Sequence, residues 1–230
     1  MMKNKVGIVG ITGRMGTLLE ELLRDSADFS LAGGISSKST KADFEKVIGN
    51  SDVLIDFSSS FATMAALEVA SRCGTPSVIG TTALSPEDFE KIKVYSQSIP
   101  IMYCTNFSLG IQLMATLLQK CAAVLPEFDF SIIDVHHKKK KDSPSGTALF
   151  LAEQVGKEAQ IVGIRSGNVC GDHICDFCGD DEMLSISHRV FNRAAFAKGA
   201  LKCASWLLNQ KPALYSTKDY LDKKMHAWDQ

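Results

Sequence analysis

KVGIVGITGRMG, residues 5–16, joins a short apolar run to glycines at positions 10, 13 and 16. The residues that follow, TLLEELL at 17–23, place leucines at helical spacing, so the pattern predicts a strand, a glycine-rich turn and then a helix. Glycines let the backbone turn tightly and approach a pyrophosphate, whose charge then faces the N–H groups at the helix start. The spacing is G-x-x-G-x-x-G rather than G-x-G-x-x-G, so a plain tight turn is the alternative, but the strand and helix around it favour dinucleotide binding.

Strand and helix patterns alternate through the rest of the first half. Strands are predicted at 29–35, 52–58, 76–80 and 99–104, with a helix at 61–70. A further helix is predicted to start at Ser85, because proline and two acids follow this capping residue. The alternation is typical of a parallel, doubly wound α/β sheet of the Rossmann type, in which the ligand lies beyond the carboxyl ends of the strands.

Residues at these strand ends form the candidate cofactor site. The second strand ends in Ser36-Ser37-Lys38, where NAD-preferring sites usually have a carboxylate for the ribose 2′-hydroxyl. Hydroxyls and an ammonium group could instead accept a 2′-phosphate, so the sequence favours NADPH and leaves NADH open; a polar loop without any contact is the alternative. The candidate residues are Gly10, Ile11, Thr12, Gly13, Arg14, Met15, Ser36, Lys38, Phe57, Gly80, Thr81, Thr82, Cys104, Thr105, Asn106 and Phe107.

The second half contains a segment with three features that attract anions. A strand predicted at 128–137 ends in two histidines, four lysines follow at 138–141, and a Ser-Gly-Thr turn at 145–147 opens a helix. Helix starts and cations bind carboxylates, and a histidine beside them can donate a proton near neutral pH. The segment therefore indicates a dicarboxylic substrate that is protonated while it is reduced. A solvated lysine face with polar loop histidines is the alternative.

This segment, HHKKKKDSPSGTA at 136–148, resembles the H-H-x-x-K-x-D-x-P-S-G-T-A motif of the 4-hydroxy-tetrahydrodipicolinate reductases. The glycine turn at 10–16 is similar to the G-x-x-G-R-M-G loop of the same family. Further stretches match in the same order at 78–82, 106–110, 171–173 and 192–200, so the resemblance covers nearly the whole chain. Asp134 and Asp172 stand where the family more often has Glu, and little sequence lies between Ile35 and Asp52, which implies a shortened loop on the adenine side.

The resemblance implies a Rossmann domain at 1–106 and 210–230, and an α/β domain at 107–209 for substrate binding and tetramerisation. The second domain would hold an open mixed sheet, with strands at 161–165, 174–178 and 184–190, and a helix at 193–208. The implied reaction belongs to lysine and diaminopimelate biosynthesis: NAD(P)H gives hydride to one carbon of a cyclic imine acid, and a protein acid protonates its neighbour. By resemblance, His136 is the proton donor and Lys140 its partner; the substrate's carboxylates are held by His137, Ser145, Gly146 and Thr147.

The composition of the chain argues against several other classes of protein. With 25 basic and 26 acidic residues, the chain lacks the basic field of a nucleic-acid binder, and no apolar run reaches the length of a membrane span. The N-terminus does not resemble a signal peptide, so we expect a cytoplasmic protein. Cys170, His173, Cys175 and Cys178 could hold a metal, but strand alternation would point them to opposite faces; we therefore expect reduced cysteines and no metal.

Two other functions remain as alternatives. A dehydrogenase of an amino-acid-like substrate would share the nucleotide-binding half, and a sensor protein could bind the cofactor without catalysis. Neither alternative explains a proton donor beside a dianion site at 136–147.

Overall fold

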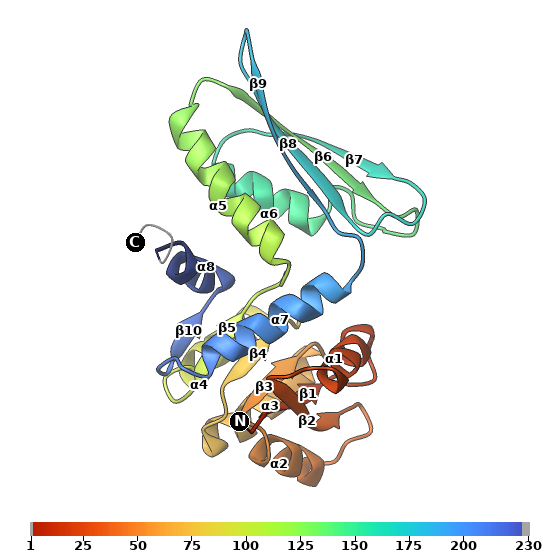
Figure 1. Ribbon diagram of the computed structural model, residues 1–230, viewed down its shortest axis with the longest axis vertical. Coiled ribbons are helices and arrows are strands. Elements are labelled where there is room, and N and C mark those ends of the chain that lie inside the picture. The colour runs from red at the N-terminus through yellow and green to blue at the C-terminus, as the bar shows by residue number, and fades with distance from the viewer. Residues whose placement is uncertain (1, 227–230) are drawn as a thin grey trace. The chain divides into compact units, whose positions relative to one another are not determined.

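The computed structural model describes residues 2–226 and divides the chain into two compact units (Figure 1). The first unit contains the residues up to Phe107 and those from Phe196 onward, and the second contains Ser108–Ala195. The chain therefore passes between the units twice. None of the helices within 2–226 is long and apolar enough to cross a membrane.

The first unit is built on a parallel six-stranded sheet, as predicted. Its strand order is β10-β5-β4-β3-β1-β2. The strands are β1 (Asn4–Val9), β2 (Phe29–Ile35), β3 (Val53–Asp56), β4 (Ser77–Ile79), β5 (Pro100–Tyr103) and β10 (Ala213–Tyr215). The helices are α1 (Arg14–Arg24), α2 (Lys41–Gly49), α3 (Ser60–Cys73), α4 (Pro86–Tyr95) and α8 (Thr217–His226), together with most of α7 (Ala194–Leu207).

Apolar side chains from sheet and helices form the core of this unit. Leu54, Ile79 and Ile101 of the sheet pack with Ile48 of α2 and Ile92 of α4, all of them buried. Each such side chain stabilises the fold by about 1.5–3 kcal/mol when fully buried. The helix start predicted at Ser85 is confirmed, because Ser85 caps α4 in a capping box with Asp88.

A helix lies in the short stretch between Ile35 and Asp52, to which no element was assigned from the sequence. α2 begins after Thr40, whose side chain and that of Asp43 form a capping box. Phe44 and Ile48 are one turn apart and both are buried in the core. Two apolar residues at helical spacing are thus enough to fix a nine-residue helix once the sheet is present.

The second unit has a four-stranded mixed sheet in the order β7-β6-β8-β9, which confirms the predicted open mixed sheet. β7 is parallel to β6, whereas β8 and β9 continue the sheet in antiparallel fashion. The elements are α5 (Leu109–Val124), β6 (Asp129–His136), α6 (Gly146–Val155), β7 (Gln160–Arg165), β8 (Asp172–Cys178) and β9 (Met183–Arg189).

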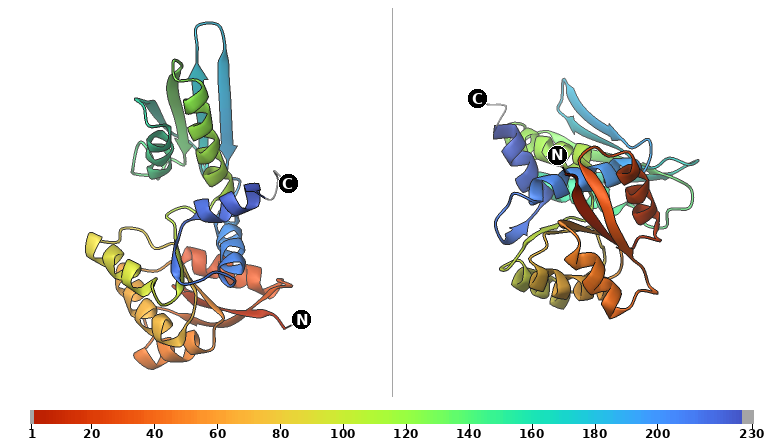
Figure 2. Two further views of the ribbon diagram at one scale, coloured as in Figure 1. Left: turned by 90° about the vertical axis from the view of Figure 1, so that its left-hand side faces the viewer. Right: turned by 60° about the horizontal axis from the view of Figure 1, so that its bottom comes forward.

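Only one face of this sheet is covered by helices within the described residues. α5 and α6 lie over this face (Figures 1 and 2). Phe130, Ile132 and Phe177 of the sheet are buried in a core with side chains of these two helices. The opposite face is also apolar, and Val162 and Ile164 on it are 49% and 42% exposed. The second sheet thus has a covered face with a core and an uncovered face without one.

The compact units differ from the expected domain boundaries at one helix. Residues 196–209 were expected in the second domain, but α7 groups with the first unit from Phe196 onward. β10 returns to the first sheet and pairs with β5, as the sequence analysis expected of the tail. The last positions of the expected first domain, 227–230, lie outside the described residues.

α7 approaches the loop after β5 so closely that only glycine fits at position 199. A Cβ atom at Gly199 would lie 1.9 Å from the carbonyl oxygen of Phe107, which is backbone and cannot rotate away. We expect Gly199→Ala to lower the free energy of unfolding by about 2 kcal/mol or more, as overpacking does. Urea denaturation would measure this effect.

Gly49→Ala provides the matched control. A methyl group there would meet no described atom within 4 Å, and alanine favours a helix more than glycine does. This variant should be as stable as the parent or slightly more so. Equal stability of the two variants would contradict the proposed close contact at Gly199.

Candidate active site

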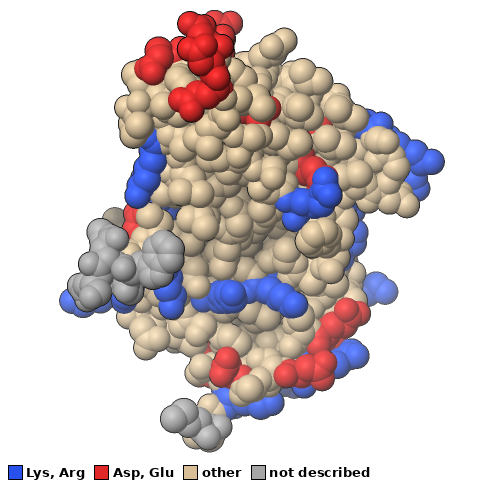
Figure 3. All heavy atoms as spheres, turned by 45° about the horizontal axis from the view of Figure 1, so that its top comes forward, with Lys and Arg blue, Asp and Glu red and all other residues tan. Residues whose placement is uncertain are grey.

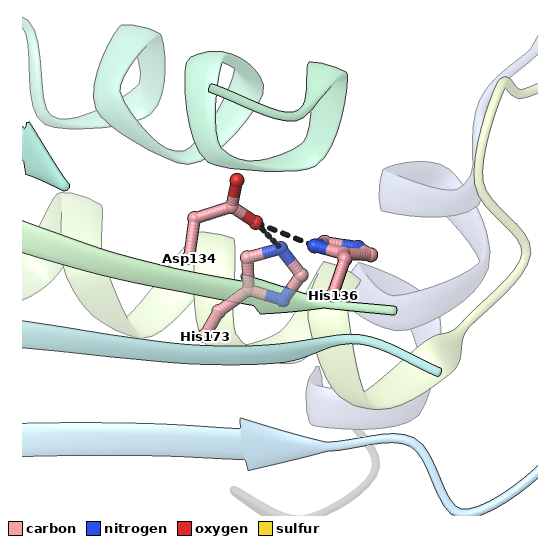
Figure 4. Close-up of side chains that lie close together, drawn as sticks. All are labelled: Asp134, His136 and His173. Carbon is pink, nitrogen blue, oxygen red and sulfur yellow. Dashed lines mark ion pairs between the residues drawn. The ribbon is translucent and has the colours of Figure 1, made fainter. Parts of the chain in front are cut away.

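Strand alternation brings a carboxylate and two imidazoles together on the covered face of the second sheet. Asp134 and His136 are two positions apart on β6, so both side chains point to this face. His173 is the partner of Asp134 on β8, and Arg165 is the partner of His136 on β7. Figure 4 shows both imidazoles directed toward the Asp134 carboxylate.

Asp134 is the centre of this group. Its side chain is fully buried, and its Oδ1 lies 2.8 Å from Nδ1 of His136 and 3.3 Å from Nε2 of His173. The backbone N–H and the hydroxyl of Ser145 both donate to the carboxylate at 2.8 Å, and Arg165 donates from 3.1 Å. Burial alone would raise the pKa of Asp134, but these hydrogen bonds outweigh it and the pKa is lowered. Asp134 is therefore a carboxylate at neutral pH.

The two ring nitrogens of His136 have different surroundings. Nδ1 is close to Asp134, although its N–H bond does not point straight at the oxygen, so the contact is chiefly electrostatic. Nε2 pairs with none of the described residues and faces Gly171, where a Cβ atom would come within 3.0 Å of it. Burial lowers the pKa of His136, Asp134 opposes that effect, and Lys140 and Arg165 add to it. An anionic ligand would therefore promote protonation of the ring.

His173 and His188 have more restricted roles. Burial lowers the pKa of His173 to about 4, so this ring is neutral at physiological pH. His188 on β9 lies 3.3 Å from the hydroxyl of Ser108, the capping residue of α5. His136 is thus the histidine of this group that combines a contact to Asp134 with an accessible nitrogen.

The four lysines of the 138–141 run differ in their surroundings. Lys138, Lys139 and Lys141 are exposed, whereas the Lys140 side chain is 23% exposed and its Nζ lies 2.9 Å from Asp142. Lys140 lowers the pKa of Asp142. The interpretation as a solvated face therefore fits three of the lysines, and Lys140 is the one held at the site.

Charge is separated along the second sheet. The lysine run and Arg165 lie where β6 and β7 end. Acidic side chains gather at the other end, on the β8–β9 turn, where Asp180, Asp181 and Glu182 lie beside Glu127 (Figure 3). The basic end is the one that carries His136.

The start of α6 is organised by Ser145 from the inside. Its hydroxyl accepts the Ala148 N–H at 3.1 Å and donates to Asp134, and the residue is 1% exposed. Gly146 is exposed and Thr147 half-buried. His137 is half-buried, and its carbonyl accepts the Lys140 N–H. The structure thus turns Ser145, a predicted substrate contact, toward Asp134.

Asp134, His136 and His173 are also the only group of three possible metal ligands, among residues 2–226, whose ligand atoms lie within 4.8 Å of one another. Arg165 and Ser145 already satisfy the carboxylate, and the charges of Arg165 and Lys140 oppose a cation. We therefore interpret the group as a hydrogen-bonded cluster.

The cysteine-rich segment does not converge on one point. β8 alternates as predicted, with His173 and Cys175 on the covered face and Cys178 on the other. Cys170 precedes the strand, and its thiol contacts the carbonyl of Phe191. These residues therefore do not assemble a metal centre in the described part of the chain.

The glycine turn of the first unit has the geometry of an anion cradle. Gly10 has a positive φ of 85°, and a Cβ there would lie 2.8 Å from the Phe57 carbonyl oxygen. Gly13 caps α1 without any side-chain bond, and the first turn of α1, residues 14–17, holds no acid. The N–H groups at this helix start are thus left for an external anion, which fits the pyrophosphate of a dinucleotide.

The other predicted cofactor residues lie at the same edge of the first sheet. Gly80 leaves room for the Phe57 ring, because a Cβ atom at position 80 would lie 2.1 Å from that ring. The Phe57 ring in turn packs edge-on against the ring of Phe107. Exposed at this edge are Thr12, Gly13, Arg14, Lys38, Thr82 and Thr105. Half-buried are Gly10, Ile11, Met15, Ser36, Phe57, Cys104 and Asn106, and buried are Gly80, Thr81 and Phe107.

Thr81 belongs to a buried polar cluster that the sequence analysis missed. Asp56 accepts hydrogen bonds from Ser58, Thr63 and Thr81 and is 3% exposed. Burial raises the pKa of Asp56, and the bonds from Ser58, Thr63 and Thr81 oppose that rise. The cluster fixes the loops after β3 and β4 that border the cofactor edge. A carboxylate at the end of an apolar strand was the available signal.

Removing this carboxylate should destabilise the first unit. We expect Asp56→Ala to lower the free energy of unfolding by about 2 kcal/mol or more, because several buried donors lose their acceptor. Asp56→Asn keeps one acceptor oxygen and should cost less than half as much. Urea unfolding of both variants would measure the difference, and equal losses would show that the hydrogen bonds are not the cause.

Comparisons with known proteins match both parts of the chain to the same family. Residues 4–107 match the family model described as dihydrodipicolinate reductase, N-terminus, and residues 110–221 match the one described as dihydrodipicolinate reductase, C-terminus. The chain is 35% identical to a 4-hydroxy-tetrahydrodipicolinate reductase of Rickettsia rickettsii (strain Sheila Smith), over 93% of this chain and 97% of the relative. It is 38% identical to the protein of that name from Helicobacter hepaticus (strain ATCC 51449 / 3B1), over 95% and 99%.

A solved structure shares the fold. The dipicolinate-bound dihydrodipicolinate reductase from Paenisporosarcina sp. TG-14 superposes with a TM-score of 0.80 at 18% identity. The match covers 94% of this chain and 98% of that one.

Proposed function

The chain belongs to the dihydrodipicolinate reductase family, and from this premise we propose that it reduces 4-hydroxy-tetrahydrodipicolinate to tetrahydrodipicolinate with NAD(P)H, in lysine and diaminopimelate biosynthesis. The observation that carries the proposal is the His136 cluster beside Lys140 and the start of α6. A dianionic substrate that must be protonated requires both cations and an acid at one place. We place the reaction in the cytoplasm.

The predicted site residues other than Ser145, which faces Asp134, have these roles in the proposal. Lys140, His137 and the helix start at Gly146 and Thr147 hold the substrate's carboxylates, and His136 gives the proton. The glycine turn at 10–15 and the edge from Phe57 to Phe107 hold the dinucleotide, which supplies the hydride when bound. Burial lowers the pKa of His136, so the ring, once protonated, is a stronger acid and gives up its proton more readily.

The direct test is oxidation of the reduced nicotinamide, followed by its absorbance. Substrate would be generated in place by condensing pyruvate with aspartate semialdehyde. Rapid oxidation that depends on both precursors supports the proposal. Folded protein that binds the cofactor but shows no oxidation would instead favour the sensor function.

We also propose that NADPH is preferred. No carboxylate follows β2, and Ser36 and Lys38 stand in that place, with the Ser36 hydroxyl accepting the Lys38 N–H at 3.2 Å. An ammonium group beside the ribose favours a 2′-phosphate, so kcat/KM should be about 5- to 50-fold higher with NADPH. Parallel assays with both cofactors measure this ratio, and a higher value with NADH would refute the preference.

We further propose a homotetramer that forms through the uncovered face of the second sheet. Exposed Val162 and Ile164 support this assembly, since an apolar sheet face is normally covered by a partner. Sedimentation velocity at the working concentration tests it, and a monomer there would refute it.

A further inference from the structure

We propose that Asp134 is a positioning residue for this reaction: it holds the His136 ring through Nδ1, so that the proton leaves from Nε2. The inference rests on the proposed function, because it concerns how the proton donor is oriented. It adds a residue to which the sequence analysis gave no role.

The geometry around His136 distinguishes its two nitrogens. Nδ1 is buried and lies 2.8 Å from a carboxylate oxygen. Nε2 has no partner among the described residues, and the residue facing it is Gly171, which has no side chain. The protein therefore places a carboxylate beside one nitrogen and leaves the other open to a ligand.

The Asp134 carboxylate is itself fixed in place. Ser145 donates to both of its oxygens, one from the backbone and one from the hydroxyl, and Arg165 donates from β7. The donors come from the start of α6 and from a neighbouring strand, so rotation of the carboxylate would break bonds to both. A carboxylate held from several sides can orient an imidazole without adjustment during the reaction.

The proton transfer balances without any further reactant. The protonated ring carries hydrogen on both nitrogens, and the nearby carboxylate stabilises its charge. The Nε2–H bond breaks, its electron pair stays on the nitrogen, and the proton forms a C–H bond at the substrate carbon next to the one that receives hydride. The neutral ring keeps its hydrogen on Nδ1, the nitrogen beside Asp134, and water reprotonates Nε2.

The neighbouring groups do not replace Asp134 in this role. His173 contacts the same carboxylate oxygen, but burial lowers its pKa to about 4, so its ring is neutral. Lys140 and Arg165 face His136 with positive charge, which disfavours the imidazolium. Asp134 is thus the charged group at this ring that favours protonation.

The first test uses the unaltered protein. Nitrogen-15 NMR at about pH 8, with His136 assigned by its loss in His136→Gln, reports which ring nitrogen carries hydrogen in the neutral form. We expect the Nδ1–H tautomer. The Nε2–H tautomer would overturn the proposal. This reading needs no turnover, so it stands apart from a failure of the proposed function.

The second test removes the charge. We expect Asp134→Asn to lower kcat by about 100-fold with little change in cofactor binding, and Asp134→Glu to recover part of that loss. The reaction requires the protonated form of His136. Without Asp134, the remaining influences on the His136 pKa are burial, Lys140 and Arg165, and all of them lower it. The limb on which kcat falls with rising pH should therefore move to lower pH in Asp134→Asn.

Asp129→Asn, an exposed position on the same strand, is the matched control and should behave like the parent. A pH limb in Asp134→Asn that coincides with that of the control would overturn the proposal. If Asp134→Asn does not fold, the tautomer of the parent and the kinetics of Asp134→Glu decide.

Gly171→Ala probes the other nitrogen. Its methyl group would lie 3.0 Å from Nε2, so we expect about a 10-fold loss in kcat while the tautomer stays Nδ1–H. Unchanged kcat would show that Nε2 does not face the substrate.

Discussion

Replacing His136 by glutamine is expected to lower kcat by about 10²- to 10⁴-fold, the usual contribution of a positioned acid. Glutamine can fill much of the same space beside Asp134, but its amide cannot give up a proton at neutral pH. The ring is 8% exposed and lies in the second unit, whereas the glycine turn proposed to bind the dinucleotide lies in the first. Cofactor affinity should therefore stay close to that of the parent.

Steady-state kinetics together with cofactor binding by fluorescence would measure both effects. The dependence of kcat on pH should also lose the limb that His136 produces. His137→Gln is the informative neighbour, because a residue that only binds the substrate should raise KM more than it lowers kcat. A His136→Gln enzyme within about threefold of the parent would remove this residue from the mechanism.

Replacing Lys140 by methionine is expected to raise KM for the substrate by about 10- to 100-fold, with a smaller effect on kcat. Methionine keeps the length of the side chain and removes the charge that meets a carboxylate. Lys140 is the partly buried lysine of the run, and Asp142 holds its Nζ at 2.9 Å. A cation fixed in this way loses less freedom on binding than an exposed one does.

Lys141→Met is the control for that experiment. Its side chain is exposed, and salt screens charges on the surface, so KM should change less than about threefold. Equal increases in KM for the two variants would mean that the whole run acts as a diffuse field and that Lys140 has no special position.

Most of the fold could be predicted from local patterns of apolar, glycine and hydroxyl residues in the sequence. The first sheet follows from apolar runs that end in glycine or hydroxyl residues, and β2 begins and ends at the predicted residues. α2 was missed because its apolar residues are few and packing supplies its stability. α7 groups with the first unit and meets the Phe107 backbone at Gly199, a contact between distant positions that the spacing of residues in the sequence does not reveal.

Only part of the candidate site could be predicted from the sequence. His136 and Lys140 stand in a specific motif, and Asp134 could have been added, since two positions along a strand share a face. Arg165 and Gly171 reach His136 only through the pairing of β6 with β7 and β8, which the sequence does not specify. Ser145 and Thr81 were expected to face ligands, but both hydroxyls point to buried carboxylates. A short hydroxyl side chain in a loop can form a hydrogen bond with the protein interior as easily as with a ligand, and the sequence does not show which.

The return of the chain to the first sheet has a consequence for biosynthesis. β10 adds to the edge of β5, and the hydroxyl of Thr217 meets the thiol of Cys104 across 113 positions of sequence. The second unit is contiguous in sequence, whereas the first is completed only after β10 has been synthesised, so we expect the second to be the first that can fold during synthesis. A ribosome that stops early would release a protein with β5 as a bare sheet edge, which is the kind of surface that recruits other unfinished chains.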